Sequence, residues 1–255
     1  MSRIALALLL FAACGGDDDG GGGGDGGDGG VGAQFASTGA TFTNSGTITG
    51  GNGGARGTGG SANGTAGAGG AGIVGAGLTV INSGSVTGGL SGNGVTRANA
   101  ITFTGGTNTL ELRAGSSITG NVVAFSTADT LALGGTTDAS FDVSQIGSSA
   151  QYQGFGVFQK TGSSTWTLTG TNTAALPWAI NAGTLIVNGT MANSTMTVNN
   201  GGTLAGTGTV GATTINSGGT FAPGNSPGTM TVAGNLAFQS GALYVSIPRP
   251  RRAAM

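Results

Sequence analysis

Short stretches in which large apolar residues alternate with small or polar ones recur along most of this chain. Clear examples are residues 109–113, 130–133 and 195–198. A period of two sends apolar side chains to one face and polar side chains to the other, which is typical of short β-strands. The 3.6-residue period of a helix is missing, and the abundance of Gly and Thr disfavours helix as well. The pattern therefore predicts an all-β chain.

The alternating stretches come at a nearly constant interval between residues 181 and 244. Three copies place two small residues, a Thr and a large apolar residue after an Asn, with 19 residues from Thr184 to Thr203 and 17 from Thr203 to Thr220. Glycines between the strands accept the positive φ of a tight corner. Self-similarity near 20 residues is typical of a solenoid, whose coils bury apolar faces against each other. Each coil is expected to run strand, corner, strand, corner.

The most distinctive stretch runs from Gly201 to Leu236. It contains Gly-Gly-Thr-Leu-Ala-Gly-Thr-Gly-Thr-Val-Gly and then Ala-Pro-Gly-Asn-Ser-Pro-Gly-Thr, and it closely resembles the passenger-associated repeat of bacterial autotransporters. Residues 155–170 resemble a second stretch found in such passengers ahead of that repeat. The resemblance implies a right-handed parallel β-helix, a β-solenoid of the pectin-lyase-like type. It also implies carriage to a Gram-negative cell surface by a C-terminal β-barrel, with the repeat aiding secretion and folding.

The N-terminal composition differs from that of the solenoid. Residues 1–14 have the apolar core and small residues of an export signal. Residues 11–15 resemble a bacterial lipobox, in which Cys14, the one cysteine, would be lipidated. Residues 15–30 are only Gly and Asp and are expected to form a flexible, disordered linker.

The solenoid passenger is expected over residues 31–245, with the autotransporter-associated repeat at about 181–240. Residues 246–255 contain two prolines and three arginines, which cannot extend an interior strand. This segment is expected to be an aberrant tail, as a truncated or frameshifted reading frame before a barrel would produce, or a cap on the last coil.

The solenoid pattern is looser between residues 31 and 105. Residues 41–51 and 79–89 are near-copies, with 38 residues from Asn44 to Asn82, which we interpret as two coils of about 19 residues. Residues 53–72 between them are expected to form a long loop or a poorly packed coil that leaves the stack. At this period residues 31–245 would make about eleven coils.

Few side chains are suited to catalysis. The chain has no His, so neither a Ser-His-Asp triad nor a His-based metal site can form. Asp138 and Asp142 lie four residues apart across an expected turn, where Asp commonly bonds to nearby backbone. Glu111 and Arg113 are expected to form a solvated pair. We nominate no catalytic, cofactor-binding or metal-binding residue, and we expect no cofactor.

Aromatic residues gather in the middle of the chain. They are Tyr152, Phe155, Phe158, Trp166 and Trp178. We expect them to stack between coils in the core, with a carbohydrate-binding platform as the alternative.

The expected function is that of a non-enzymatic passenger, displayed on the cell surface or outer membrane or secreted, which acts as a stalk with adhesive capacity. The expected partners are the outer membrane, a translocator β-barrel outside this chain, and a host surface or like passengers. A net charge of −1 argues against a nucleic-acid partner. Two alternatives stay open. A β-helix polysaccharide lyase or hydrolase would need clustered carboxylates, and a free-standing solenoid lipoprotein would need processing at Cys14.

Overall fold

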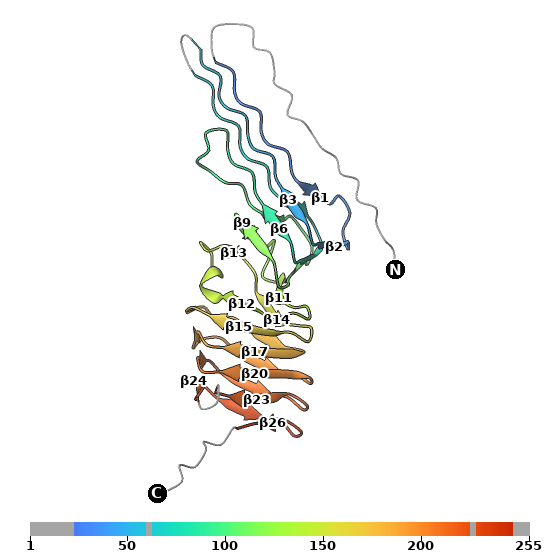
Figure 1. Ribbon diagram of the computed structural model, residues 1–255, viewed down its shortest axis with the longest axis vertical. Coiled ribbons are helices and arrows are strands. Elements are labelled where there is room, and N and C mark those ends of the chain that lie inside the picture. The colour runs from blue at the N-terminus through green and yellow to red at the C-terminus, as the bar shows by residue number, and fades with distance from the viewer. Residues whose placement is uncertain (1–22, 60–62, 225–227, 247–255) are drawn as a thin grey trace, which may run out of the picture. The chain divides into compact units, whose positions relative to one another are not determined.

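The computed structural model describes residues 23–59, 63–224 and 228–246 (Figure 1). The chain divides into two compact units, which are residues 1–108 with 115–125 (unit 1) and residues 109–114 with 126–255 (unit 2). Short strands dominate both units. Among the described residues the one helical element is a single 3-10 turn, η1 (Val143–Gln145).

Unit 1 contains three sheets in which every third strand of the chain is a neighbour. The first sheet has the order β1 (Ala33–Gln34), β4 (Ile73–Gly75), β7 (Ile101–Phe103) and β10 (Val122–Val123). The second pairs β2 (Thr41–Asn44) with β5 (Thr79–Asn82), and the third has the order β3 (Thr47–Thr49), β6 (Ser85–Thr87) and β9 (Ser117–Thr119).

Unit 2 repeats this arrangement. Its first sheet has the order β8 (Thr109–Leu112), β11 (Thr130–Leu133), β14 (Val157–Lys160), β16 (Trp178–Ile180), β19 (Met196–Val198), β22 (Thr213–Ile215) and β25 (Leu236–Phe238). The second has the order β12 (Ala139–Asp142), β15 (Thr165–Thr169), β17 (Gly183–Val187), β20 (Gly202–Gly206), β23 (Thr220–Pro223) and β26 (Leu243–Tyr244). The third has the order β18 (Thr190–Met191), β21 (Thr209–Val210) and β24 (Thr231–Val232), and β13 (Tyr152–Gln153) precedes β14 in the chain.

Neighbouring strands in these sheets run parallel, so each unit is a stack of coils, as a parallel β-solenoid requires. The predicted fold class is confirmed. The repeat also stacks as predicted, because Thr184, Thr203 and Thr220 lie opposite one another in register. Where three sheets are present, a coil has three strands rather than the two expected. The third strand, such as β18, has only two residues, which is too short to show alternation in the sequence.

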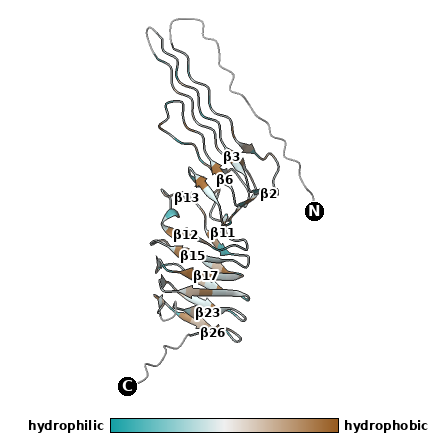
Figure 2. Cartoon of the chain, viewed as in Figure 1, coloured by the Kyte–Doolittle hydropathy of each residue, from teal (hydrophilic) through white to brown (hydrophobic). Residues whose placement is uncertain are grey.

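The core of unit 2 consists of columns of apolar side chains that run from coil to coil. Trp166, Leu185, Leu204 and Phe221 form one column and are at most 3% exposed. Figure 2 shows hydrophobic residues on the strands of this stack. Burial of such side chains stabilises a fold by about 1.5–3 kcal/mol each, and because each coil supplies one member of a column, every coil depends on its neighbours.

The coil length predicted for unit 1 is wrong. Asn44 on β2 lies opposite Asn82 on β5, so the 38 residues between them make one coil and not two. The main sheets contain two strands of this kind in unit 1 and seven in unit 2, which gives nine coils among the described residues in place of about eleven. The extra residues of the long coil lie in a corner that projects from the strands.

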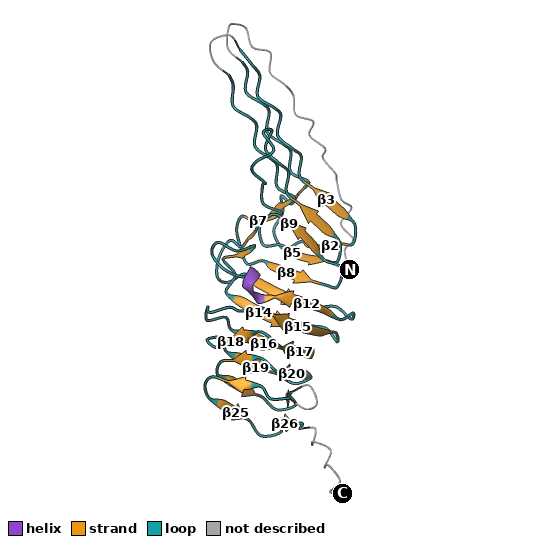
Figure 3. Cartoon of the chain, turned by 60° about the vertical axis from the view of Figure 1, so that its left-hand side comes forward, coloured by secondary structure: helices purple, strands orange, loops and turns teal. Residues whose placement is uncertain are grey.

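This corner forms what we call the glycine arm, residues 23–32, 50–59, 63–72 and 88–100. The chain leaves β3 at Thr49 and returns at Ile73, leaves β6 at Thr87 and returns at Ile101, and leaves β9 at Thr119 and returns at Val122. The excursion therefore shortens from one coil to the next. Figures 1 and 3 show the segments of the arm side by side, extended but without helix or strand.

Hydrogen bonds in the arm recur every third residue. The backbone N–H groups of Gly26, Gly29 and Gly32 donate to Thr65, Ala68 and Ala71 at 2.8–2.9 Å. Those of Gly51, Gly54 and Gly57 donate to Gly30, Gly27 and Gly24 at 2.7–2.8 Å. Three residues per turn is the period of a polyproline II helix, which makes no internal hydrogen bonds and exposes its backbone groups to neighbours. The arm is thus a bundle of such helices.

Glycine is required in the arm because the backbones approach closely. A Cβ atom on Gly26 would lie 2.1 Å from the carbonyl oxygen of Gly54, and one on Gly67 would lie 2.1 Å from that of Gly27. Neither glycine has a positive φ. A side chain at these positions would therefore separate the strands, whatever its own backbone preference.

Two expectations fail here. Residues 23–30 of the predicted flexible, disordered linker are bonded into the arm, whereas residues 15–22 lie outside the described residues. Residues 53–59 and 63–72 do leave the strand stack, as predicted, but they are regularly bonded rather than poorly packed.

Candidate functional site

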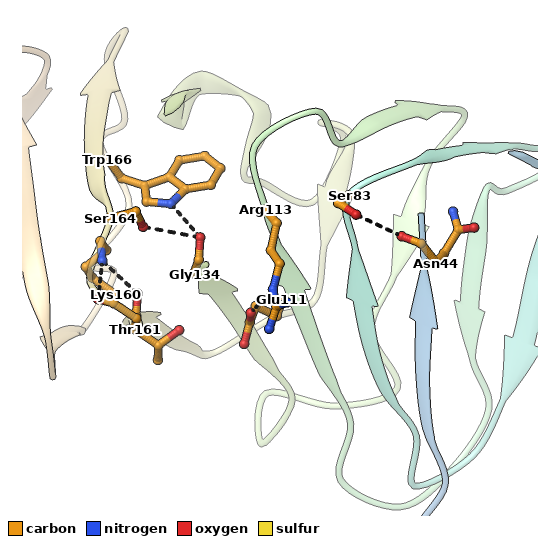
Figure 4. Close-up of polar contacts among 10 residues, drawn as sticks. Asn44, Ser83, Glu111, Arg113, Gly134, Lys160, Thr161, Ser164 and Trp166 are labelled. Atoms are coloured by element: carbon orange, nitrogen blue, oxygen red, sulfur yellow. Dashed lines mark hydrogen bonds and ion pairs between the residues drawn. The ribbon is translucent and has the colours of Figure 1, made fainter. Parts of the chain in front are cut away.

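The charged side chains of unit 2 offer the best place to look for chemistry (Figure 4). Glu111 and Arg113 project from the end of β8 and form an ion pair, with 2.6 Å between Glu111 Oε1 and Arg113 Nε. Their side chains are 19% and 42% exposed. The predicted pairing is confirmed. A partly exposed pair of this kind contributes little to stability, typically up to about 1 kcal/mol.

Lys160 lies nearby at the end of β14 and is fully buried. In the register of the sheet it occupies a core position between Leu133 and Ile180. Its ammonium donates to three backbone carbonyls, those of Thr161 at 2.6 Å, Gly162 at 3.0 Å and Ala182 at 3.1 Å. Lys160 therefore ties the corners of two successive coils together.

Burial lowers the pKa of Lys160 to about 8, against the opposing effect of the Asp138 and Glu111 carboxylates. A lysine with such a pKa is a candidate nucleophile or base. Solvent has no access to this one, however, and its carbonyl partners already occupy the donor hydrogens. The arrangement favours a structural role.

The space beside Lys160 is tightly filled around Gly134. Trp166 Nε1 and Ser164 Oγ both donate to the Gly134 carbonyl oxygen, at 3.0 and 3.3 Å. A Cβ atom on Gly134 would lie 2.6 Å from Glu111 Cδ and 2.7 Å from Thr161 Oγ1. Thr161 Oγ1 is itself buried and has no hydrogen-bond partner among the described residues. This cluster is packed like a core and leaves no room for a substrate.

Asp138 and Asp142, the acidic pair considered from the sequence, both accept bonds from the backbone. Asp138 Oδ1 accepts from the Thr165 amide at 2.7 Å, and Asp142 Oδ1 caps η1 by accepting from the Ser144 amide at 2.9 Å. This use of Asp agrees with the turn interpretation. No group of three or more Cys, Asp or Glu residues is placed to hold a metal ion in the described part of the chain.

The five aromatic residues lie in the core, as predicted, so they do not form a carbohydrate-binding platform. Tyr152, Phe155, Phe158, Trp166 and Trp178 are at most 8% exposed. Phe158 and Trp178 lie opposite each other on β14 and β16, with ring centroids 5.4 Å apart.

Polar side chains in the glycine arm form a feature that sequence reasoning missed. Asp25 Oδ1 accepts from the amide and the hydroxyl of Thr65, at 2.6 and 2.8 Å. Asp28 Oδ1 accepts from the Ala68 amide at 2.7 Å, three residues further along both strands. The Thr65 bonds, the amide first, lower the pKa of Asp25. The signal in the sequence was the Gly-Gly-X triplet, which places one side chain outside the bundle at every third residue.

Cys14, the predicted lipidation residue, lies outside the described residues. The described part of the chain has no helix that combines the length and the apolarity needed to cross a bilayer. Comparisons of the chain with protein-family models, with curated proteins and with solved structures gave no match.

Proposed function

We propose that this chain is a non-enzymatic passenger of the autotransporter type, displayed on the surface of a Gram-negative cell or secreted, where it acts as a stalk. The observation that carries the proposal is the in-register stacking of β17, β20 and β23. These strands hold the sequence that resembles the passenger-associated repeat, and they form consecutive coils, as a passenger repeat would.

The side chains of unit 2 fit a structural role better than a catalytic one. Its buried lysine is held by carbonyls, and the two acidic residues Asp138 and Asp142 bond to backbone amides. We therefore place the polysaccharide lyase or hydrolase second, with no observation that favours it. Adhesion would use the exposed strand faces, with a host surface or like passengers as partners.

The proposal is tested by display. The chain is fused ahead of a translocator β-barrel in a Gram-negative host, and intact cells are probed with an antibody and with an external protease. Passenger function predicts antibody binding that the protease removes. A Gly206→Val variant, which disturbs the repeat, should reach the surface less well than a Thr207→Val control. Retention of the parent chain inside the cell, or equal display of the two variants, would contradict the proposal.

The stand-alone lipoprotein is distinguished by labelling. Without the fused barrel, a lipoprotein incorporates labelled palmitate, and Cys14→Ser abolishes the label. A label that depends on Cys14, combined with failed display of the barrel fusion, would favour the lipoprotein over the passenger.

A further inference from the structure

The last described coil of unit 2 exposes large apolar side chains on its outer side. Leu236, Phe238, Leu243, Tyr244 and Val245 are between 41% and 59% exposed. They are five of the seven exposed large hydrophobic residues among those described, and the other two, Val95 and Phe125, belong to unit 1. We call these five residues the terminal face. Such concentration in one place is typical of an interaction surface.

Two members of the terminal face occupy core columns. Phe238 lies opposite Ile215, which is fully buried, and Tyr244 lies opposite Phe221, which is 3% exposed. The register thus directs both rings toward the core. They are exposed because no described coil covers them, whereas the equivalent side chains of earlier coils are each covered by the next coil.

The terminal face also has two strand edges. β25 pairs with β22, and β26 pairs with β23, so each strand has one described neighbour in its sheet. The outer edge of a strand presents backbone N–H and C=O groups that favour pairing with another strand. A matching partner must therefore supply two strand edges with apolar side chains between them. The end of a β-solenoid has this form, and the chain itself supplies one.

Charge favours a second copy as the partner. Residues 228–246 contain no Asp, Glu, Lys or Arg, so two copies of this face approach without like-charge repulsion among those residues. Phe221, Phe238 and Tyr244 form an aromatic cluster with ring centroids 6.1–6.2 Å apart. Aromatic rings in such tilted and edge-on arrangements pack well against further rings.

From these observations we infer that the terminal face binds the terminal face of a second copy, end to end. In a two-fold arrangement the same patch is used twice, and β25 pairs antiparallel with β25 of the other copy. The inference goes beyond the proposed function and does not depend on surface display.

Sedimentation of the full chain over a range of micromolar concentrations tests the inference. The parent chain should form dimers, and a Phe238→Glu, Tyr244→Glu double variant should associate at least tenfold more weakly. Val95→Glu is the matched control, because it adds the same charge at an exposed apolar residue elsewhere and should leave association unchanged. A parent chain that is monomeric throughout, or a double variant that associates like the parent, overturns the inference.

The orientation is tested with Gln239→Cys in a Cys14→Ser background. Gln239 is exposed directly after β25, so end-to-end packing should give a disulfide-linked dimer on mild oxidation. Dimers that do not cross-link would contradict this packing. A chain that stops at Ser246 separates a further occupant, the chain's own C-terminal segment. If only this shortened chain dimerises, residues 247–255 cover the face and the inference is wrong.

Discussion

The side chain of Asn44 donates a hydrogen bond of 2.8 Å to Oδ1 of Asn82, although 38 residues separate them in the chain. Asn82 in turn donates to Ser116 Oγ at 2.6 Å and to the Gly84 carbonyl at 3.0 Å. A ladder of buried amides therefore connects three coils of unit 1. Asn181, Asn199 and Asn216 form a similar ladder in unit 2, with bonds of 2.7 Å.

Asn82→Ala should destabilise unit 1 by about 2–3 kcal/mol, because it removes a buried donor and acceptor from partners that have lost contact with water. Chemical denaturation followed by circular dichroism measures the change. Asn235→Ala, at an exposed residue, should shift the unfolding midpoint little. Equal midpoints for the two variants would mean that the ladder contributes no stability.

Gly67→Ala should loosen the glycine arm, because its Cβ atom would lie 2.1 Å from the Gly27 carbonyl oxygen. Hydrogen exchange of amides in residues 50–59 and 63–72 is expected to speed up about tenfold or more, since the arm can open without unfolding of the strands. Gly46→Ala is the control, because a Cβ atom there meets nothing within 4 Å. Unchanged exchange in Gly67→Ala would show that the arm is not closely packed in solution.

Gly206→Val should weaken the C-terminal coils by about 3 kcal/mol or more, because Gly206 has a φ of 117° and a Cβ atom there would lie 2.2 Å from the Val187 carbonyl oxygen. Gly208→Val should also destabilise, but for one reason only. Its φ is not positive, and the obstacle is the Gly189 carbonyl oxygen at 2.1 Å. Thr207→Val, between them and exposed, should cost less than about 1 kcal/mol. Denaturant midpoints that fail to rank the variants in this way would argue against the corner.

The stability of unit 2 should rise with pH between about 8 and 10. Burial lowers the pKa of Lys160 to about 8, below its ordinary value in the unfolded chain, so the unfolded chain binds more protons in this range. Deprotonation then favours the folded state, by at most about 3 kcal/mol, and the stabilisation is lost again as the pH falls through 8. The three carbonyl acceptors reduce the gain because they stabilise the ammonium.

Unfolding midpoints measured from pH 7 to 9.5 check this expectation. The range stops there because burial raises the pKa of Tyr152, and ionisation of that tyrosine in the unfolded chain lowers stability at higher pH. Lys160→Met should abolish the rise. A rise that persists in Lys160→Met would assign it to another group.

Local patterns in the sequence predicted the strands and many of the corners correctly. Alternation in residues 195–198 reflects burial of one face only, and β19 forms there with Met196 and Val198 inward. Gly201 and Gly218 have positive φ values of 82° and 74°, as the corner interpretation requires. Core positions of the aromatic residues followed from the same alternation. The third strand of each coil was missed, because two residues are too few to show a period.

The candidate site was predicted less well. The pairing of Glu111 with Arg113 and the backbone bonding of Asp138 and Asp142 followed from short-range spacing. The burial of Lys160 did not, because its carbonyl partners include Ala182, which the next coil supplies. Whether a charged residue at a strand end faces solvent or carbonyls depends on that neighbouring coil.

The sequence by itself determined that this chain forms short strands joined by glycine corners, and that its coils stack in parallel, because alternation and positive φ are properties of a few adjacent residues. Only the tertiary structure decided the length of each coil and the order in the glycine arm. A polyproline II strand makes no hydrogen bonds within itself. Its regularity therefore appears only when Gly26 and Gly54, from distant parts of the chain, come within reach of each other.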